Sequence, residues 1–393
     1  MNSFSKFISR LKTKINYANN NRDKNLWIFG EWLGRRCNDN SLFFANYIAA
    51  NKKNIKVVWV TNPDTDISLL DKTINVAYID DPSTFPLFKK AGVVIMNEGY
   101  ADFSLRGYDY FDGAITVNLW HGVPWKRIGL DMEKSKAKKS WKHMVLLLQP
   151  YNFVLANSQY MYDIVKKAFC VNDKQIIKAG FPRNTIFFDK KKIEKTKEKL
   201  NAIIKKEYNF EDEQPQIVTY LPTFRDTQIK TFSFTEAMDN HKLVDVLDKH
   251  NALIIERMHL MSESKKDDRQ QKFNRVLNID TISTQELLAC SDVLITDYSS
   301  CFFDFLHTGR PIIHYLYDYE YYMNDDRGLY APKEDVVAGS VAYNLDELIQ
   351  ALDSYLSDKS KDQTLREERR SAFMSLDKEG CCEDIYNRIC EII

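Results

Sequence analysis

A histidine followed by a glycine and a proline has the clearest setting for chemistry in this chain. It lies in the stretch 118–131, NLWHGVPWKRIGLD, where a β-prone run ends and His121 is followed by Gly122 and Pro124. Ligands of open α/β sheets bind at the carboxyl ends of strands, and the glycine permits close backbone approach. An imidazole there can act as a general base, and the two cations later in the stretch suit an anionic ligand. The alternative is a core histidine beside a turn, which the local pattern alone does not exclude.

Cationic, imidazole and hydroxyl side chains also follow several other runs that we expect to be strands. In chain order these are GFPRN with Arg183, LPTF with Pro222 and Thr223, ERMH with Arg257, Met258 and His259, and DYSS with Ser299 and Ser300. Arginine can hold a phosphate through two hydrogen bonds, and a second histidine can donate to a phosphate or a leaving group. A single arginine is more often a surface ion-pair partner, so the inference of a phosphate site rests on the whole set.

The two serines of DYSS are expected at the N-terminus of a helix over residues 301–307. Free N–H groups and the positive end of the helix dipole favour an anion there, and the hydroxyls add donors. Ser299 could instead be an ordinary N-cap, and the two roles can coexist. Asp304, one turn later, could face the same site or only solvent.

Strands and helices alternate along the chain, which predicts parallel βαβ construction. The expected strands are 26–29, 57–60, 74–79, 92–96, 114–119, 152–156, 176–179, 216–221, 252–257, 276–279, 292–296 and 311–315. The expected helices include 41–51, 83–90, 159–169, 234–250, 284–290, 301–307 and 345–356. A cationic helix over 189–207 and an acidic, proline-containing break at 211–215 indicate a linker. We therefore predict two doubly wound, Rossmann-like α/β domains that face a cleft: an acceptor-side domain, 25–210, and a nucleotide-donor domain, 211–393.

The first 24 residues have a different character. Apolar residues recur with helical spacing in MNSFSKFISRLKTKI, and residues 1–24 carry six positive charges against one negative. A basic amphipathic helix of this kind can lie in the interface of an anionic membrane. The alternative is an ordinary first helix that packs on the protein body.

Composition excludes several classes of protein. The 55 basic and 55 acidic residues cancel, whereas a nucleic-acid-binding protein is usually basic. The seven cysteines have no CxxC spacing, so we expect reduced thiols and no zinc site. The sequence has no GxxxxGK[ST], GxGxxG, GxSxG or HExxH motif, which argues against a P-loop nucleoside triphosphatase, an ordinary dinucleotide site, a serine hydrolase and a zinc protease. No cofactor and no metal are expected.

Five of these segments in this order resemble one known family. NLWHGVPWKRIGLD, GFPRN, YLPTFRD, ERMH and DVLITDYSSCFFDF are similar to motifs of the CDP-glycerol glycerophosphotransferases of teichoic acid and capsule synthesis. The resemblance implies a two-domain, glycosyltransferase-B-like fold. It also implies transfer of glycerol phosphate from CDP-glycerol to a hydroxyl of a polyprenyl-diphosphate-linked saccharide acceptor, with release of CMP.

The resemblance also implies roles for residues. His121 matches the catalytic base, and His259 would act on the leaving group. The matching donor-binding residues are Gly122, Val123, Pro124, Trp125, Arg183, Pro222, Thr223, Arg257, Met258, Ser299, Ser300 and Asp304. The loop departs from the family pattern at Val123, where a small hydroxyl residue is usual.

A lipid-linked acceptor implies a peripheral enzyme at the cytoplasmic face of the cell membrane, held there by the N-terminal segment. Three alternatives stay open. The donor could be CDP-ribitol or another polyol-phosphate donor. The enzyme could be a sugar transferase that uses a nucleotide-sugar on the same fold. The chain could also be a membrane-associated scaffold without activity, although its two strand-end histidines argue against this.

Overall fold

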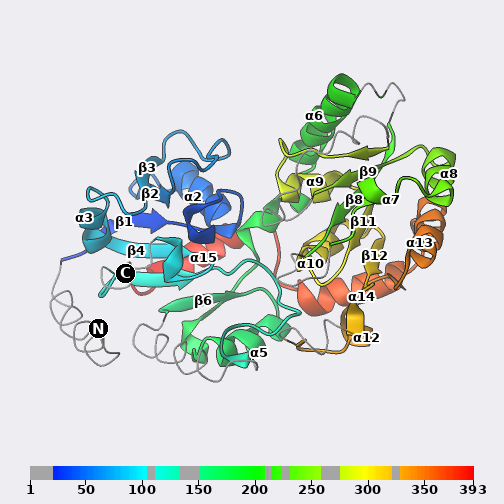
Figure 1. Ribbon diagram of the computed structural model, residues 1–393. Helices are drawn as coiled ribbons and strands as arrows, with labels where there is room; N and C mark the ends of the chain where they lie inside the picture. Colours follow the sequence, from blue (N-terminus) through cyan, green and yellow to red (C-terminus); the bar gives the residue numbers. More distant parts are fainter. Residues whose placement is uncertain are drawn as a thin grey trace, which may run out of the picture.

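The computed structural model describes residues 21–103, 111–132, 151–208, 210, 214–223, 231–257, 275–320 and 328–393. These residues form two β-sheets, one on the left and one on the right in Figure 1, each accompanied by helices. The strand pairings within both sheets are parallel. The prediction of an α/β chain with parallel sheets is therefore confirmed.

The first sheet has seven strands in the order β3-β2-β1-β4-β5-β6-β7. They are β1 (Asp23–Phe29), β2 (Lys56–Thr61), β3 (Asn75–Tyr78), β4 (Ala91–Met96), β5 (Ile115–Asn118), β6 (Phe153–Ala156) and β7 (Ile176–Lys178). The connecting helices are α2 (Asn40–Asn51), α3 (Phe85–Lys90) and α5 (Gln159–Ala168). Every residue of the central strand β4 is buried, which explains its continuous apolar sequence AGVVIM.

The second sheet has six strands in the order β10-β9-β8-β11-β12-β13. They are β8 (Gln216–Leu221), β9 (Ala252–Glu256), β10 (Val276–Leu277), β11 (Val293–Thr296), β12 (Ile312–Tyr315) and β13 (Ser340–Ala342). Helices α8 (His241–Lys249) and α13 (Leu345–Ser357) cover one face, while α6 (Lys190–Tyr208) and α9 (Thr284–Cys290) cover the other. Successive side chains of a strand point to opposite faces, so neighbours such as Ile217 and Val218 belong to different apolar clusters.

The last helix, α15 (Cys381–Cys390), returns to the first sheet, where both cartoon views show it beside α2. The ring of Tyr386 lies 5.9 Å from that of Trp27 in β1, and Glu383 pairs with Lys52 at 2.8 Å. Conversely, Leu200 of α6 packs with the second sheet. The chain thus crosses between the halves on both sides of the expected linker. The domain boundary at residues 210 and 211 stays a prediction.

Two elements of the second half differ from the sequence-based prediction. The single helix expected over 234–250 is split into α7 (Phe234–Ala237) and α8, because Asn240 accepts hydrogen bonds from the N–H groups of Lys242 and Leu243 and starts a new helix. Strand β13 was not expected, since three residues carry little pattern. The charged tail contains α14 (Gln363–Phe373) before α15.

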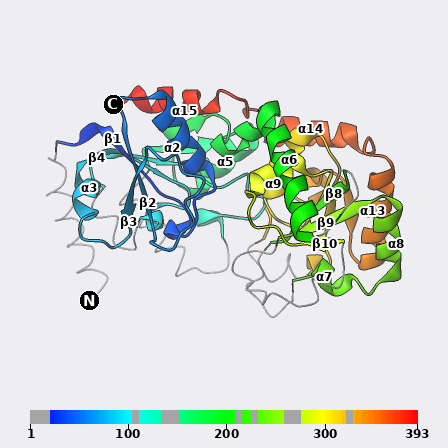
Figure 2. The same cartoon turned by 90° about the horizontal axis from the view of Figure 1, so that it is seen from above.

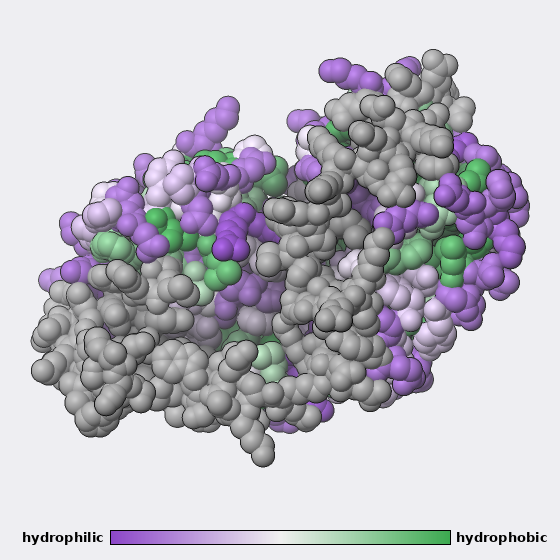
Figure 3. All heavy atoms as spheres, in the orientation of Figure 1, coloured by the Kyte–Doolittle hydropathy of each residue, from purple (hydrophilic) through white to green (hydrophobic). Residues whose placement is uncertain are grey.

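Of the predicted N-terminal amphipathic segment, residues 1–24, the structure describes only residues 21–24. The predicted helix lies outside the described residues. Within residues 21–24, the guanidinium of Arg22 donates to the carbonyl oxygens of Phe88, Ala91 and Asp112. This cation is therefore bound to the folded protein. The helices that the structure describes include none long and apolar enough to cross a membrane. On the face seen in Figure 3, the described surface is mostly hydrophilic with small hydrophobic areas, as expected when the sheets bury their apolar faces.

Candidate active site

Several residues predicted to do chemistry follow strands at or next to the place where the strand order of each sheet reverses. In the first sheet the reversal lies between β1 and β4, and in the second between β8 and β11. In open α/β sheets, ligands bind beyond the carboxyl ends of the strands at such reversals. Glu31 follows β1 and Glu98 follows β4, while His121 follows the adjacent strand β5.

His121 is paired with a carboxylate that the sequence analysis did not single out. Its Nδ1 lies 2.9 Å from Oε1 of Glu98, and each side chain is 25% exposed. Burial opposes protonation of the imidazole, but the carboxylates of Glu98 and Asp39 outweigh it, so the pKa of His121 is raised. Because Glu98 occupies Nδ1, Nε2 is the nitrogen that can exchange a proton with a substrate. An imidazole in close contact with a carboxylate can act as a general base.

The Glu98 loop is held by a second buried acid, Asp102. Its carboxylate accepts hydrogen bonds from the N–H groups of Asn97 and Glu98 at 2.9 and 2.8 Å, and from that of Leu33 at 2.9 Å. Asp102 therefore ties the loop after β4 to the loop after β1. This fixes the backbone from which Glu98 reaches His121.

Aromatic rings hold the imidazole from the sides. The ring centroid of His121 lies 4.1 Å from that of Trp120 and 5.3 Å from that of Trp32. Gly122 follows with φ of 127°, a conformation that other residues rarely adopt. A Cβ atom there would lie 2.6 Å from Nη2 of Arg183 and 3.0 Å from Oγ of Ser300. The structure thus brings His121, Gly122, Arg183 and Ser300 together.

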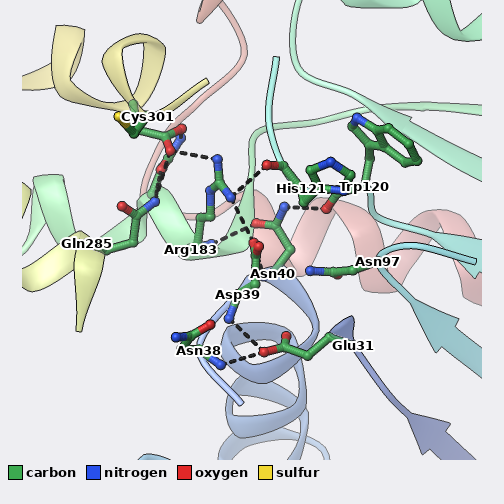
Figure 4. Close-up of polar contacts among 12 residues, drawn as sticks. Glu31, Asn38, Asp39, Asn40, Asn97, Trp120, His121, Arg183, Gln285 and Cys301 are labelled. Atoms are coloured by element: carbon green, nitrogen blue, oxygen red, sulfur yellow. Dashed lines mark hydrogen bonds and ion pairs between the residues drawn. The ribbon is translucent and has the colours of Figure 1, made fainter. Parts of the chain in front are cut away.

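Arg183 joins the two halves of the site. It lies in the 3₁₀ segment η6 (Pro182–Phe188), and its guanidinium donates to Oδ1 of Asp39 at 2.9 Å, to Oδ2 of Asp304 at 2.6 Å and to the carbonyl of His121 at 2.8 Å. Burial opposes its charge, but the carboxylates of Asp304 and Asp39 raise its pKa. Figure 4 shows Arg183 between the His121 side and the Gln285 side of the site. These contacts place Arg183 as a support of the His121 backbone, and direct contact with a phosphate stays a prediction.

Asp304 is buried and faces Arg183, not solvent. It lies in α10 (Cys301–Phe305) and also accepts from Asn184 at 3.0 Å and from Gln285 at 3.1 Å. Asn184 donates in turn to Asp377 at 2.6 Å. The result is a buried polar network that links η6 of the first half to α9, α10 and the segment before α15. Asp304 therefore supports Arg183 in this arrangement, and its predicted role in donor binding stays a prediction.

The second half presents hydroxyl groups at its strand reversal. Asp297, after β11, accepts from the N–H and Oγ1 of Thr223 at 2.9 and 2.6 Å and from the N–H of Ser299 at 3.2 Å. Pro222, before Thr223, is buried. The residue before α10 is Ser300, not Ser299, and its side chain makes no capping hydrogen bond. The hydroxyl of Ser299 accepts from the N–H of Cys301 at 3.5 Å, and the predicted contact of both serines with an anion stays a prediction.

Of the predicted trio Arg257, Met258 and His259, the structure describes only Arg257. The guanidinium of Arg257 donates to the carbonyl oxygens of Ile279 and Ile282, and burial lowers its pKa. Met258 and His259 lie outside the described residues. The roles predicted for all three stay predictions.

The loop after Gly122 is used for packing between the halves. Val123 is fully buried, and Trp125 donates through Nε1 to the carbonyl of Ala331 at 2.9 Å. The carbonyl of Pro124 accepts from the hydroxyl of Tyr160 at 3.2 Å. The side chains of Val123 and Trp125 are thus committed to the core, so a donor contact from this loop would come from its backbone.

The residues that sequence reasoning missed are the acids Glu98, Asp39, Asp102 and Asp297. Glu98 and Asp297 follow expected strands closely, which is the same signal that identified His121. The sequence analysis did not predict them because an anionic ligand is expected to contact cations and hydroxyl groups. No group of His, Cys, Asp and Glu among the described residues could hold a metal ion.

The Arg183–Asp304 contact makes a testable contribution to stability. Arg183→Gln should lower the free energy of unfolding by about 3–5 kcal/mol, because it leaves buried carboxylates without their partner. The double variant Arg183→Gln/Asp304→Asn should lose less than the sum of the single variants. Urea unfolding followed by tryptophan fluorescence and circular dichroism measures both. Lys242→Gln, which removes an exposed pair with Asp346, is the control and should change nothing measurable. Strict additivity would contradict a coupled buried pair.

Comparisons with known proteins agree with this architecture. Residues 12–391 match the family described as CDP-Glycerol:Poly(glycerophosphate) glycerophosphotransferase. The chain is 26% identical over 387 residues to the teichoic acid glycerol-phosphate transferase of Staphylococcus aureus (strain NCTC 8325 / PS 47), an alignment that covers 94% of this chain and 93% of that protein. It is 26% identical over 339 residues to the teichoic acid poly(glycerol phosphate) polymerase of Bacillus subtilis (strain 168), covering 83% of this chain but only 43% of that relative.

The fold is also that of a solved structure. The wall teichoic acid polymerase TagF, in a single-residue variant, superposes with a TM-score of 0.80 at 20% identity, covering 99% of this chain and 97% of that one. This likeness supports the glycosyltransferase-B-like fold that the resemblance implied. Because the family model covers nearly the whole sequence, the chain belongs to the CDP-glycerol:poly(glycerophosphate) glycerophosphotransferase family of enzymes.

Proposed function

We propose that the protein transfers glycerol phosphate from CDP-glycerol to a hydroxyl of a polyprenyl-diphosphate-linked acceptor and releases CMP, in teichoic acid or capsule synthesis. The observation that carries the proposal is the His121–Glu98 pair, an oriented base that stands beside Ser300 of the second half across Gly122. Family membership supports the donor, and one TagF structure is described with CDPG.

The geometry suggests how the groups divide the reaction. Nε2 of His121 takes the proton of the acceptor hydroxyl as that oxygen attacks the glycerol-bearing phosphorus. A new P–O bond forms, the bond to the CMP oxygen breaks, and CMP leaves with the electron pair. Glu98 stabilises the imidazolium that forms, and its help is greatest once the proton has moved. The proton is afterwards returned to solvent.

The donor phosphates would lie against the second half. Ser299 and Ser300 offer hydroxyl donors there, and the buried network from Asp304 through Arg183 keeps the His121 carbonyl and Gly122 in register with them. Arg257 and His259 would neutralise charge on the departing CMP. Positioning and electrostatics of this kind supply most of the catalysis in phosphoryl-type transfer.

A second donor is kept open by a specific observation. The relatives include the teichoic acid ribitol-phosphate polymerase TarL of Staphylococcus aureus (strain NCTC 8325 / PS 47), which is 26% identical over 251 residues, 61% of this chain and 42% of that protein. CDP-ribitol is therefore the alternative donor.

Product analysis tests the proposal directly. The purified chain is incubated with a lipid-linked acceptor and either CDP-glycerol or CDP-ribitol, and CMP release is measured. We expect CMP from CDP-glycerol, and a loss of about 10²–10⁴-fold in rate in a folded His121→Ala variant, the usual contribution of a general base. CMP from CDP-ribitol alone would reassign the donor. No CMP from either, with a nucleoside diphosphate released from a nucleotide-sugar, would replace the proposal by sugar transfer.

Glu98→Gln tests the orienting role without removing the base. The change keeps the side-chain shape but removes the charge that raises the pKa of His121, so the acidic limb of kcat/KM should move to lower pH. The other charged groups that face His121, Asp39 and Arg183, are left in place. We expect kcat to fall about 10²-fold or more, with the KM for CDP-glycerol little changed. The double variant Glu98→Gln/His121→Ala should have the same kcat as His121→Ala alone. If Glu98→Gln lowers kcat as much in the His121→Ala background as in the wild type, Glu98 does not act through His121.

Membrane contact through residues 1–24 is the remaining part of the proposal. A lipid-linked acceptor requires an enzyme that works at a membrane surface, and this segment has the charge and apolar spacing for it. A chain that lacks residues 1–18 should bind anionic liposomes more weakly than the full chain. The fraction of each protein that sediments with the liposomes measures this. Equal partitioning would remove this role from the segment.

A further inference from the structure

The loop between β1 and α2 carries a strained turn beside His121. Trp32 and Leu33 adopt φ of 50° and 57°, the left-handed region that only glycine enters at little cost. The turn is held from both ends: the indole Nε1 of Trp32 donates to Asp39 at 2.9 Å, and the N–H of Leu33 donates to Asp102 at 2.9 Å. Such strain persists where surrounding contacts enforce it, and it is concentrated at functional sites.

The strained turn presents the Trp32 indole to two groups. The His121 ring lies against it, with the centroids 5.3 Å apart, and the Cζ atom of Arg36 lies 4.8 Å from the ring centroid. All three side chains are half-buried. The imidazole and the guanidinium therefore contact the same indole ring, and all three side chains are partly exposed to a ligand.

Arg36 has no anionic partner within the described part of the chain. The nearby acids are committed elsewhere: Asp39 to Arg183 and Trp32, Glu98 to His121, and Glu31 to backbone N–H groups after Arg36. Burial lowers the pKa of Arg36 even though these carboxylates oppose the change. Its guanidinium is thus partly withdrawn from water without a direct ion pair, and an arriving anion would supply one.

The reaction geometry places the acceptor on this side of His121. Ser300 and the second half approach the backbone of Gly122, where the donor would lie, whereas Trp32 and Arg36 belong to the first half. The base must touch the attacking hydroxyl, and in-line displacement keeps the attacking oxygen away from the leaving group. The acceptor hydroxyl would therefore reach Nε2 of His121 from the side of the first half, where Trp32 and Arg36 lie.

We propose that Trp32 and Arg36 form the acceptor subsite, in which the indole packs against the polyol that bears the attacking hydroxyl and the guanidinium binds the adjacent phosphate. The inference rests on the proposed function. The poly(glycerophosphate) in the family's name has both groups that this subsite would bind. Its terminal glycerol carries the free hydroxyl and is joined to the rest of the polymer through a phosphodiester. Trp32 and Arg36 would then favour extension of an acceptor that already carries a polyol phosphate.

The test separates acceptor from donor recognition. Initial rates are measured with CDP-glycerol and a lipid-linked acceptor that ends in glycerol phosphate. We expect Arg36→Gln to raise the acceptor KM about 10- to 100-fold, the usual effect of losing a hydrogen bond to a charged group, with the donor KM within about twofold. Arg35→Gln, the same charge change at the exposed neighbouring residue, should leave both unchanged. An unchanged acceptor KM in Arg36→Gln, or an equal rise in donor KM, would overturn the subsite.

A second acceptor identifies the phosphate. With a lipid-linked disaccharide that lacks glycerol phosphate, the Arg36→Gln effect should shrink to about twofold or less. An equal effect on both acceptors would mean that Arg36 binds the polyprenyl diphosphate, and the proposed placement would be wrong. Calorimetric binding of a soluble glycerol-phosphate oligomer to the full chain, to Arg36→Gln and to Arg35→Gln does not depend on turnover. It therefore decides the subsite even if the wild-type chain releases no CMP, which would be a failure of the proposed function alone.

Discussion

The site depends on a guanidinium held between two buried carboxylates. Arg183 binds Asp39 of the first half and Asp304 of the second, at 2.9 and 2.6 Å, and the same group fixes the carbonyl of His121 at 2.8 Å. Removing these charges from water is costly, so the arrangement is favourable only when all three are together. The Arg183 contacts therefore couple the docking of the two halves to the position of the base. An enzyme whose donor and acceptor are held by different halves needs such a coupling.

A second constraint acts through backbone amides. Asp102 accepts from the N–H groups of Asn97, Glu98 and Leu33, so one carboxylate positions both the acid that orients His121 and the turn that presents Trp32. Asp297 has the corresponding place in the second half, where it holds Thr223 and Ser299. In each sheet, an acid near the strand reversal thus holds neighbouring loops through their backbone N–H groups: Asp102 in the first sheet and Asp297 in the second. The acids missed by sequence reasoning are thus mainly structural supports of the residues that it found.

The parallel sheets could be predicted because buried central strands such as β4 are continuous apolar runs, and His121 because glycine and proline follow it at a strand end. The roles of Arg183 and Asp304 could not be predicted. A cation and an acid 121 residues apart in the sequence carry no local sign that they bind each other. Glu98 could have been found from its place after β4, but its 2.9 Å contact with His121 depends on the order β4-β5 in the sheet. Local sequence patterns indicate which residues are buried and where a strand ends. Which side chains on different strands meet depends on the order of the strands in the sheet.

The charges around His121 bear on where the proposed donor and acceptor would bind. Around His121 the first half places the carboxylates of Glu98 and Asp39, which raise the pKa of the imidazole and would repel a diphosphate. On the proposed function, a donor with two adjacent phosphates would therefore be better accommodated by the serine hydroxyls of the second half. A single phosphodiester can still approach the first half if one cation is left for it, and Arg36 is the cation without a direct ion pair among the described residues there. On this proposal, the same acids that raise the pKa of His121 would also, by repulsion, help to keep the donor phosphates on the side of the second half.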